Sequence, residues 1–144
     1  MGRILGLDIG DVRIGVAISD ELEITAQGFQ VIQRKYIEKD IDNIKNIIES
    51  NEVKAVIVGL PKMLNGTIGV QAQKVIDFIN ILKTKINTSI IFWDERLTTS
   101  EINKMLISAD VRRSKRREVV DKLTAQLILQ GYLDRKGAEV SERG

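Results

Sequence analysis

The segment RILGLDIG (residues 3–10), followed almost at once by RIGVAISD (residues 13–20), decides how this chain folds. Each half contains a short apolar run, and only Asp11 and Val12 separate the two halves. Short apolar runs that are divided by a glycine and a tight connection are typical of adjacent antiparallel strands. Residues 24–33 supply a third apolar run. The beginning of the chain therefore predicts a meander of three antiparallel strands.

After residue 36, stretches with helical spacing of apolar residues alternate with continuous apolar runs. The helical stretches are residues 37–50 and 69–84. The continuous runs, residues 53–59 and 89–93, are typical of strands that are buried on both faces. Because helical crossovers make such strands parallel, we expect these two strands and strand 4–8 to run parallel in the centre of the sheet.

Two more helices are expected in the last third of the chain. Thr98 begins a capping box, which predicts a helix start at that point. Ser114 is expected to cap a last helix over about residues 115–134. Since no linker or repeat divides the chain, it is expected to form one domain over residues 1–135, followed by a flexible tail at residues 136–144.

The composition restricts the chemistry that a site could use. The chain has no His and no Cys. It therefore has no disulfide, no thiolate metal site and no zinc site of the usual ligand type, and it is typical of a cytoplasmic protein. What remains are hard oxygen ligands, which suit Mg²⁺, Mn²⁺ or Ca²⁺. No apolar run reaches the roughly 18 residues that a membrane span needs, so no membrane partner is expected.

The net charge of +2 does not by itself indicate a partner, but the distribution of the basic residues along the chain does. The segment RRSKRR (residues 112–117) holds basic side chains at every position except Ser114. Such a cluster can follow a phosphate backbone, which indicates a nucleic-acid partner. The alternative is a solvated basic loop without a partner.

Acidic residues stand at three distant points of the chain. Asp8 ends the first strand, Asp94 and Glu95 follow the strand at 89–93, and Asp121 lies on the last helix. Ligands of open α/β sheets bind at the carboxyl ends of the strands. At about 4 Å and an effective dielectric near 20, two carboxylates repel by roughly 4 kcal/mol, so such a cluster persists when cations neutralise it.

Each acid also has a purely structural interpretation. Asp8 could cap a turn, and Glu95 could pair with Arg96 on the surface. Asp121 is the most informative of the three, because Thr124 and Ala125 follow it on the same helix face. Small residues beside a carboxylate on a packed helix leave room for a ligand.

Taken together and in order, four segments resemble the YqgF family, also described as RuvX-like Holliday junction resolvases and as pre-16S rRNA nucleases. The segments are LGLDIG with RIGVAISD, VIVGLP (56–61) with Asn65-Gly66, DERLTT (94–99), and Asp121 with ILQGYLD (128–134). The resemblance spans nearly the whole chain. It implies an α/β chain with the RNase H-like fold, in which a five-stranded mixed sheet of order 3-2-1-4-5 is flanked by helices.

The resemblance also implies a function. It indicates a nuclease, a hydrolase acting on ester bonds, that uses one or two Mg²⁺ or Mn²⁺ ions. The implied catalytic and metal-binding residues are Asp8, Glu95 and Asp121, with Asp94 a weaker candidate. The role assigned to the family in bacteria is processing the 5′ end of pre-16S rRNA during ribosome biogenesis.

Basic and amide side chains near the same edge are candidates for holding the nucleic acid. They are Arg13, Lys62, Asn65, Arg96, Arg112, Arg113, Lys115 and Arg116. The expected partner is pre-rRNA or, alternatively, branched DNA, and the expected assembly is a monomer or a weak homodimer. The chain departs from the family pattern at Asp11 and Val12, where a small and a basic residue are expected, and at Thr124, which replaces an Ala.

Three other functions are compatible with parts of the sequence. A resolvase of four-way DNA junctions would use the same chemistry, but it should be a symmetric dimer. The first hairpin is also similar to the phosphate loop of actin-like and sugar-kinase ATPases, which close two domains over a nucleotide, whereas this chain has one. A nucleic-acid-binding module without catalysis is disfavoured, because it has no reason to keep three carboxylates that repel phosphate.

Overall fold

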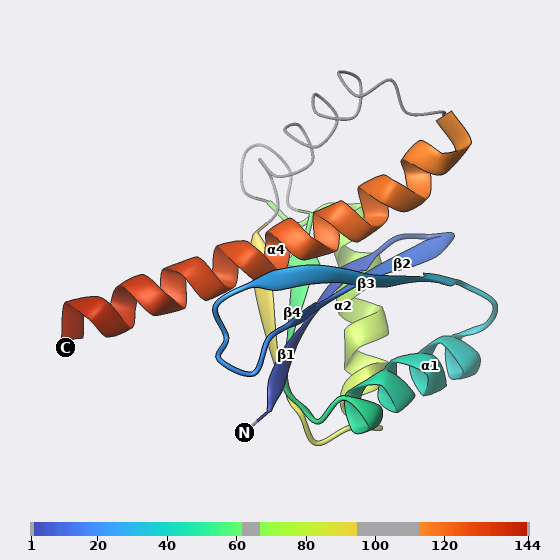
Figure 1. The fold of residues 1–144 in the computed structure, drawn as a ribbon. Helices are drawn as coiled ribbons and strands as arrows, with labels where there is room; N and C mark the ends of the chain where they lie inside the picture. Colours follow the sequence, from blue (N-terminus) through green and yellow to red (C-terminus); the bar gives the residue numbers. More distant parts are fainter. Residues whose placement is uncertain (1, 62–66, 95–112, 144) are drawn as a thin grey trace.

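The computed structural model describes residues 2–61, 67–94 and 113–143. These residues form one five-stranded sheet of order β3-β2-β1-β4-β5, with helices on both faces (Figure 1). The strands are β1 (Arg3–Ile9), β2 (Arg13–Ser19), β3 (Ala26–Gln33), β4 (Val53–Leu60) and β5 (Ser89–Asp94). The helices are α1 (Ile37–Ser50), α2 (Val70–Lys83) and α4 (Arg113–Arg143).

The pairing of the strands confirms the predicted mixed sheet. β2 is antiparallel to both β1 and β3, which is the expected meander. β4 is parallel to both β1 and β5. The strand order is the 3-2-1-4-5 order that the family resemblance implies.

The prediction that the strand at 89–93 is buried in the centre of the sheet is wrong. β5 is an edge strand, and Ile91 and Phe92 are 37% and 36% exposed. The chain crosses from β4 through α2 and adds β5 on the outer side of β4. The apolar run still has a packing role, because Ile90 and Trp93 contact the cores on opposite faces of the sheet. A continuous apolar run therefore did not distinguish a central strand from an edge strand.

An apolar core lies on each face of the sheet. The larger core joins α1 and α2 to one face, where Leu5, Leu7 and Val58 are fully buried. The second core joins α4 to the other face, where Ile4, Ala17 and Ile57 pack against Ala125, Ile128, Leu129 and Leu133. In Figure 1, α4 accordingly lies on the side of the sheet away from α1 and α2.

The last helix is longer than the sequence indicated. α4 begins at Arg113, so Ser114 lies inside the helix and is not its N-cap. The helix also continues to Arg143, beyond the predicted end at residue 134. The flexibility of residues 136–144 stays a prediction, and the helix expected from Thr98 lies outside the described residues. In the part of the chain that the structure describes, no helix is long and apolar enough to cross a bilayer.

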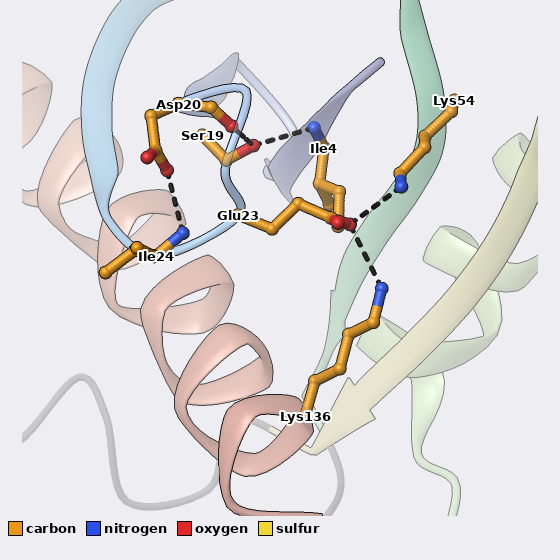
Figure 2. A network of polar contacts seen from close by, with 7 residues as sticks. All are labelled: Ile4, Ser19, Asp20, Glu23, Ile24, Lys54 and Lys136. Carbon is orange, nitrogen blue, oxygen red and sulfur yellow. Dashed lines mark hydrogen bonds and ion pairs between the residues drawn. The ribbon is translucent and has the colours of Figure 1, made fainter. Parts of the chain in front are cut away.

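Polar contacts fix α4 to the sheet at the end where β1 begins (Figure 2). The carboxylate of Glu23 accepts a hydrogen bond from Lys136 Nζ on α4 at 3.0 Å and pairs with Lys54 Nζ on β4 at 3.1 Å. Partial burial by itself would raise the pKa of Glu23, but the bonds and charges of Lys136 and Lys54 outweigh it and lower this pKa. The β2–β3 loop, β4 and α4 are therefore joined through one carboxylate.

The β2–β3 loop that carries Glu23 is itself held by local hydrogen bonds. Asp20 Oδ1 accepts from the backbone N–H groups of Ile24, at 2.8 Å, and Thr25, at 3.0 Å. These two bonds lower the pKa of Asp20. The buried Ser19 hydroxyl accepts from Ile4 N at 2.8 Å and donates to the carbonyl of Asp20 (Figure 2).

Candidate active site

Asp8 lies near the carboxyl end of β1, on the face of the sheet that α4 covers. Side chains alternate along a strand, so Asp8 shares its face with Ile4 and Gly6. Ile4 belongs to the core beneath α4, and a Cβ on Gly6 would lie 2.8 Å from Cβ of Leu129 on α4. Asp8 is therefore half-buried on the side of the sheet from which α4 approaches.

Gly15 brings Asp8 and Asp121 to the same place. Gly15 on β2 is the direct partner of Asp8 in the antiparallel register. A Cβ placed on Gly15 would lie only 2.0 Å from the backbone carbonyl oxygen of Asp121. The third turn of α4 therefore lies directly on Gly15, and two of the three predicted acids flank one glycine although they are far apart in the chain.

The carboxylate of Asp121 is held by Arg13. Arg13 Nε donates to Asp121 Oδ2 at 2.7 Å, and each of the two side chains is 21% exposed. Ion pairs that are removed from water in this way are screened by salt much less than surface pairs. This contact therefore stabilises the position of α4 on the sheet and supplies the positive charge next to Asp121.

The backbone of Arg13 is fixed by the β1–β2 turn and its neighbours. Gly10 N donates to the carbonyl of Arg13 at 2.9 Å, and Arg34 N donates to the carbonyl of Val12 at 2.9 Å. Arg34 also donates through Nη1 to the carbonyl of Gly10 at 2.8 Å and pairs through Nε with the buried Asp40 on α1 at 3.1 Å. The turn is thus anchored to α1.

Asp94 lies on the face of the sheet opposite to Asp8. It is the last residue of β5, and its register partner on β4 is Leu60. Leu60 belongs to the core beneath α1 and α2, so the register places Asp94 on the face opposite to Asp8. The ranking of Asp94 as the weaker ligand candidate stays a prediction.

Several predicted site residues lie outside the described part of the structure. They are Glu95, Lys62, Asn65, Arg96 and Arg112. Among the described residues, no three acidic side chains form a group that could hold a metal ion, and the trio with Glu95 stays a prediction.

The other basic candidates are placed through the backbone of α4 alone. Arg113, Lys115 and Arg116 lie in its first turn. At 1.5 Å per residue, that turn lies about 8–12 Å along the helix axis from Asp121. The basic cluster and Asp121 therefore belong to the same end of one helix.

The structure contains three features that the sequence did not predict: the ion pair of Arg13, the close approach at Gly15 and the buried hydroxyl of Thr124. The ion pair of Arg13 with Asp121 joins residues 108 positions apart, and no local pattern reveals it. Gly15 did carry a signal, since an isolated glycine inside a strand often marks close approach of another backbone. One turn along α4 from Asp121, Thr124 is 3% exposed, and its hydroxyl has no hydrogen-bond partner in the described structure.

A hollow of about 590 Å³ lies between β3 and α4 on the same face. Gln33, which contributes to its wall, is the register partner of Arg13, so the hollow adjoins the ion pair. Its lining mixes apolar and polar side chains: Phe29, Gln30, Val31, Gln33, Glu118, Val119, Lys122 and Leu123.

Comparison with known proteins finds relatives that are more than half identical to this chain. Two similar proteins bear the name "Putative pre-16S rRNA nuclease". The protein of Clostridium kluyveri is 53% identical over 133 residues, which cover 92% of this chain and 97% of the relative. The protein of Desulforamulus reducens is 54% identical over 132 residues, which cover 92% of this chain and 96% of the relative.

Solved structures of Holliday junction resolvases share the fold. Thermus thermophilus RuvC in complex with a Holliday junction has a TM-score of 0.57 at 12% identity, covering 95% of this chain and 97% of RuvC. The fowlpox virus resolvase in complex with junction DNA has a TM-score of 0.55 at 14% identity, covering 92% of this chain and 97% of the resolvase. At these identities the likeness concerns the fold alone.

The family described as "RuvX: Holliday junction resolvase" matches residues 2–135, which include β1, Gly15 and the part of α4 that carries Asp121. With this match and relatives more than half identical over nearly their whole length, the chain belongs to the RuvX (YqgF) family.

Proposed function

We propose that this protein is a divalent-metal-dependent nuclease that hydrolyses phosphodiester bonds at the 5′ end of pre-16S rRNA. The observation that carries the proposal is the convergence of Asp8 and Asp121 on Gly15, in a chain that has no His or Cys. The relatives named for this substrate support the choice of RNA. The proposed activity belongs in the cytoplasm, where rRNA precursors of bacteria are made.

The residues present suit Mg²⁺ or Mn²⁺. Asp8 and Asp121 supply carboxylate oxygens, the ligand type these ions prefer, and Glu95 is proposed as the third. The cation that lies on Asp121 in the structure, the guanidinium of Arg13, indicates that this place favours positive charge. The absent side chain of Gly15 lets the backbone of α4 at Asp121 lie directly against β2, next to the register partner of Gly15, Asp8.

A bound ion would supply charge for the scissile phosphate and a more acidic water at neutral pH. The protein's own residues have separate tasks. Asp8, on a central strand, and Asp121, on a packed helix, hold their oxygens in fixed places. The cluster of Arg112, Arg113, Lys115 and Arg116 is proposed to bind the phosphates on either side of the cleaved bond.

The second candidate function is the cleavage of four-way DNA junctions, which the family description favours. It would use the same carboxylates. The two functions differ in assembly, because a junction resolvase needs two symmetric active sites, whereas trimming an RNA end needs only one.

The decisive experiment incubates the pure protein and its Asp8→Asn variant with precursor 16S rRNA and with a synthetic four-way junction. Each reaction is run with Mn²⁺ and with EDTA. We expect the wild-type protein to shorten the 5′ end of the RNA with Mn²⁺ alone, and Asp8→Asn to be inactive. Cleavage that persists in EDTA would refute metal dependence, and cleavage of the junction alone would establish the second candidate.

A further inference from the structure

We propose that Arg13 and a divalent cation compete for the carboxylate of Asp121, and that substrate phosphate decides the competition by drawing Arg13 away. The inference rests on the proposed function, since it requires a metal at Asp121. It goes beyond that function because it assigns Arg13 two alternative partners. It also predicts that metal and nucleic acid bind cooperatively.

The carboxylate of Asp121 already has a cationic partner. Its Oδ2 accepts a 2.7 Å hydrogen bond from Arg13 Nε, and both side chains are about four-fifths removed from water. The guanidinium of Arg13 is the cation that faces this oxygen in the structure. A divalent ion that takes Asp121 as a ligand must therefore share the carboxylate with Arg13 or displace it.

The charge of Arg13 has opposite effects on the site with and without a bound metal ion. Without metal, the guanidinium offsets the negative charge of Asp121 and reduces its repulsion with neighbouring acids. Once a divalent ion is bound, the same guanidinium lies close to two further positive charges, in a place where water screens poorly. Arg13 thus stabilises the metal-free site and opposes metal binding.

The side chain of Arg13 can move although its backbone is held. Its backbone is fixed, because its carbonyl accepts from Gly10 N at 2.9 Å and its turn is anchored through Arg34. Its side chain is long and 21% exposed, so the guanidinium has a route to solvent. The guanidinium can therefore leave Asp121 while β2 stays in place.

A substrate phosphate is the partner that would bind Arg13 in place of Asp121. The hydrogen bond to Asp121 uses one of the five N–H donors of the guanidinium. A phosphate can accept two of these donors side by side, which makes it a better partner than the single carboxylate oxygen. Nucleic acid would then remove Arg13 from Asp121 and strengthen metal binding, and by linkage metal would strengthen nucleic-acid binding to the same degree.

A competing interpretation gives the opposite sign. If Arg13 only orients Asp121 as a fixed outer partner of the metal, its removal should weaken metal binding, as is usual when such partners are lost. The direction in which metal affinity changes therefore distinguishes the two interpretations.

The experiment measures Mn²⁺ binding to the pure full-length protein from the electron paramagnetic resonance signal of free Mn²⁺. The variants are Arg13→Gln, Arg13→Met and Asp121→Asn. The matched control is Arg3→Gln, which removes an arginine at the other end of the sheet. Each protein is measured alone and with a cleavage-resistant phosphorothioate oligonucleotide. Circular dichroism checks that each variant is folded, and Arg13→Met repeats the test with an uncharged side chain of a different kind.

We expect removal of Arg13 to tighten Mn²⁺ binding at least tenfold without nucleic acid. We expect the oligonucleotide to tighten Mn²⁺ binding to the wild-type protein and to Arg3→Gln, but not to the Arg13 variants. Unchanged or weaker Mn²⁺ binding in folded Arg13 variants would overturn the competition, while a loss of binding in Asp121→Asn would leave the metal site standing. A wild-type protein that binds no Mn²⁺ under either condition would refute both the metal site and this inference.

Discussion

Replacing Gly15 by Ala should separate α4 from the sheet at Asp121. The new Cβ would lie 2.0 Å from the carbonyl oxygen of Asp121 and 2.5 Å from its carbonyl carbon. Both are helix backbone atoms, which cannot rotate aside. Since real Cβ atoms essentially never approach closer than 3.0 Å, the helix or the strand must move by about 1 Å.

This displacement has a calculable cost. Forcing extra volume into a packed contact typically destabilises by about 1–3 kcal/mol, and a rigid backbone partner favours the upper part of that range. For a chain near 150 residues, a loss of about 2–3 kcal/mol lowers the melting temperature by roughly 4–12 °C. The same movement would shift Asp121 away from Asp8, so cleavage should fall as well.

The assay is urea unfolding, with the midpoint and slope compared between wild type and variant. Gly137→Ala is a matched control on the same helix, because a Cβ there would meet nothing within 4 Å. The control should be equally stable or more stable by about 0.5–1 kcal/mol, since Ala favours helix over Gly. If Gly15→Ala unfolds at the wild-type midpoint and retains full cleavage, the close approach of α4 to β2 is wrong.

Three further predictions concern the ion pair of Arg13 with Asp121, the contacts of Glu23 and the basic cluster. In urea unfolding, Asp121→Asn should lower the stability of the metal-free protein by about 1–2 kcal/mol, because Arg13 loses its charged partner. Relief of the repulsion between acidic residues would by itself have the opposite effect and raise the stability. Glu23→Gln should cost about 1 kcal/mol near pH 7. The pKa of Glu23 is lower in the folded protein than in the unfolded chain. Its contribution to the free energy of unfolding is therefore present above the unfolded pKa and is lost as the pH falls through the folded pKa. In strong acid the variant and the wild type should be equally stable. The last prediction concerns four basic residues, Arg112, Arg113, Lys115 and Arg116. Replacing them by Ala should weaken binding to all RNA sequences and should flatten the slope of log K against log salt by up to about 0.7 per lost phosphate contact. An unchanged slope would exclude these residues from the interface.

The parts of the fold that local patterns determine could be predicted. The helix over residues 37–50 follows from apolar residues at helical spacing, and α1 has those bounds. The meander follows from short apolar runs with tight connections. The edge position of β5 could not be predicted from its composition, because an edge strand that packs on both faces has the same apolar run as a central one.

The candidate site was predictable only in part, for a related reason. Asp8 and Asp121 could be chosen because strand ends and a helix face with small neighbours are local signals. The partner of Asp121 was not predictable, because the contact with Arg13 depends on the line along which α4 crosses the sheet. At position 15 the missing side chain lets the backbone of α4 lie directly against β2. The sequence shows this glycine, but it does not show which element packs against it.

The path of α4 also has a consequence for the order in which the molecule is made. All five strands of the sheet precede α4 in the chain, so a ribosome synthesises them before the helix emerges. Until then, Ile4, Ala17 and Ile57 have no cover, and Arg13 has no partner at residue 121. Contacts spanning such long stretches form late in folding. Phosphodiester cleavage should therefore be absent from the growing chain and begin only when α4 docks, so that an unfinished copy of this protein cannot cut the RNA around it.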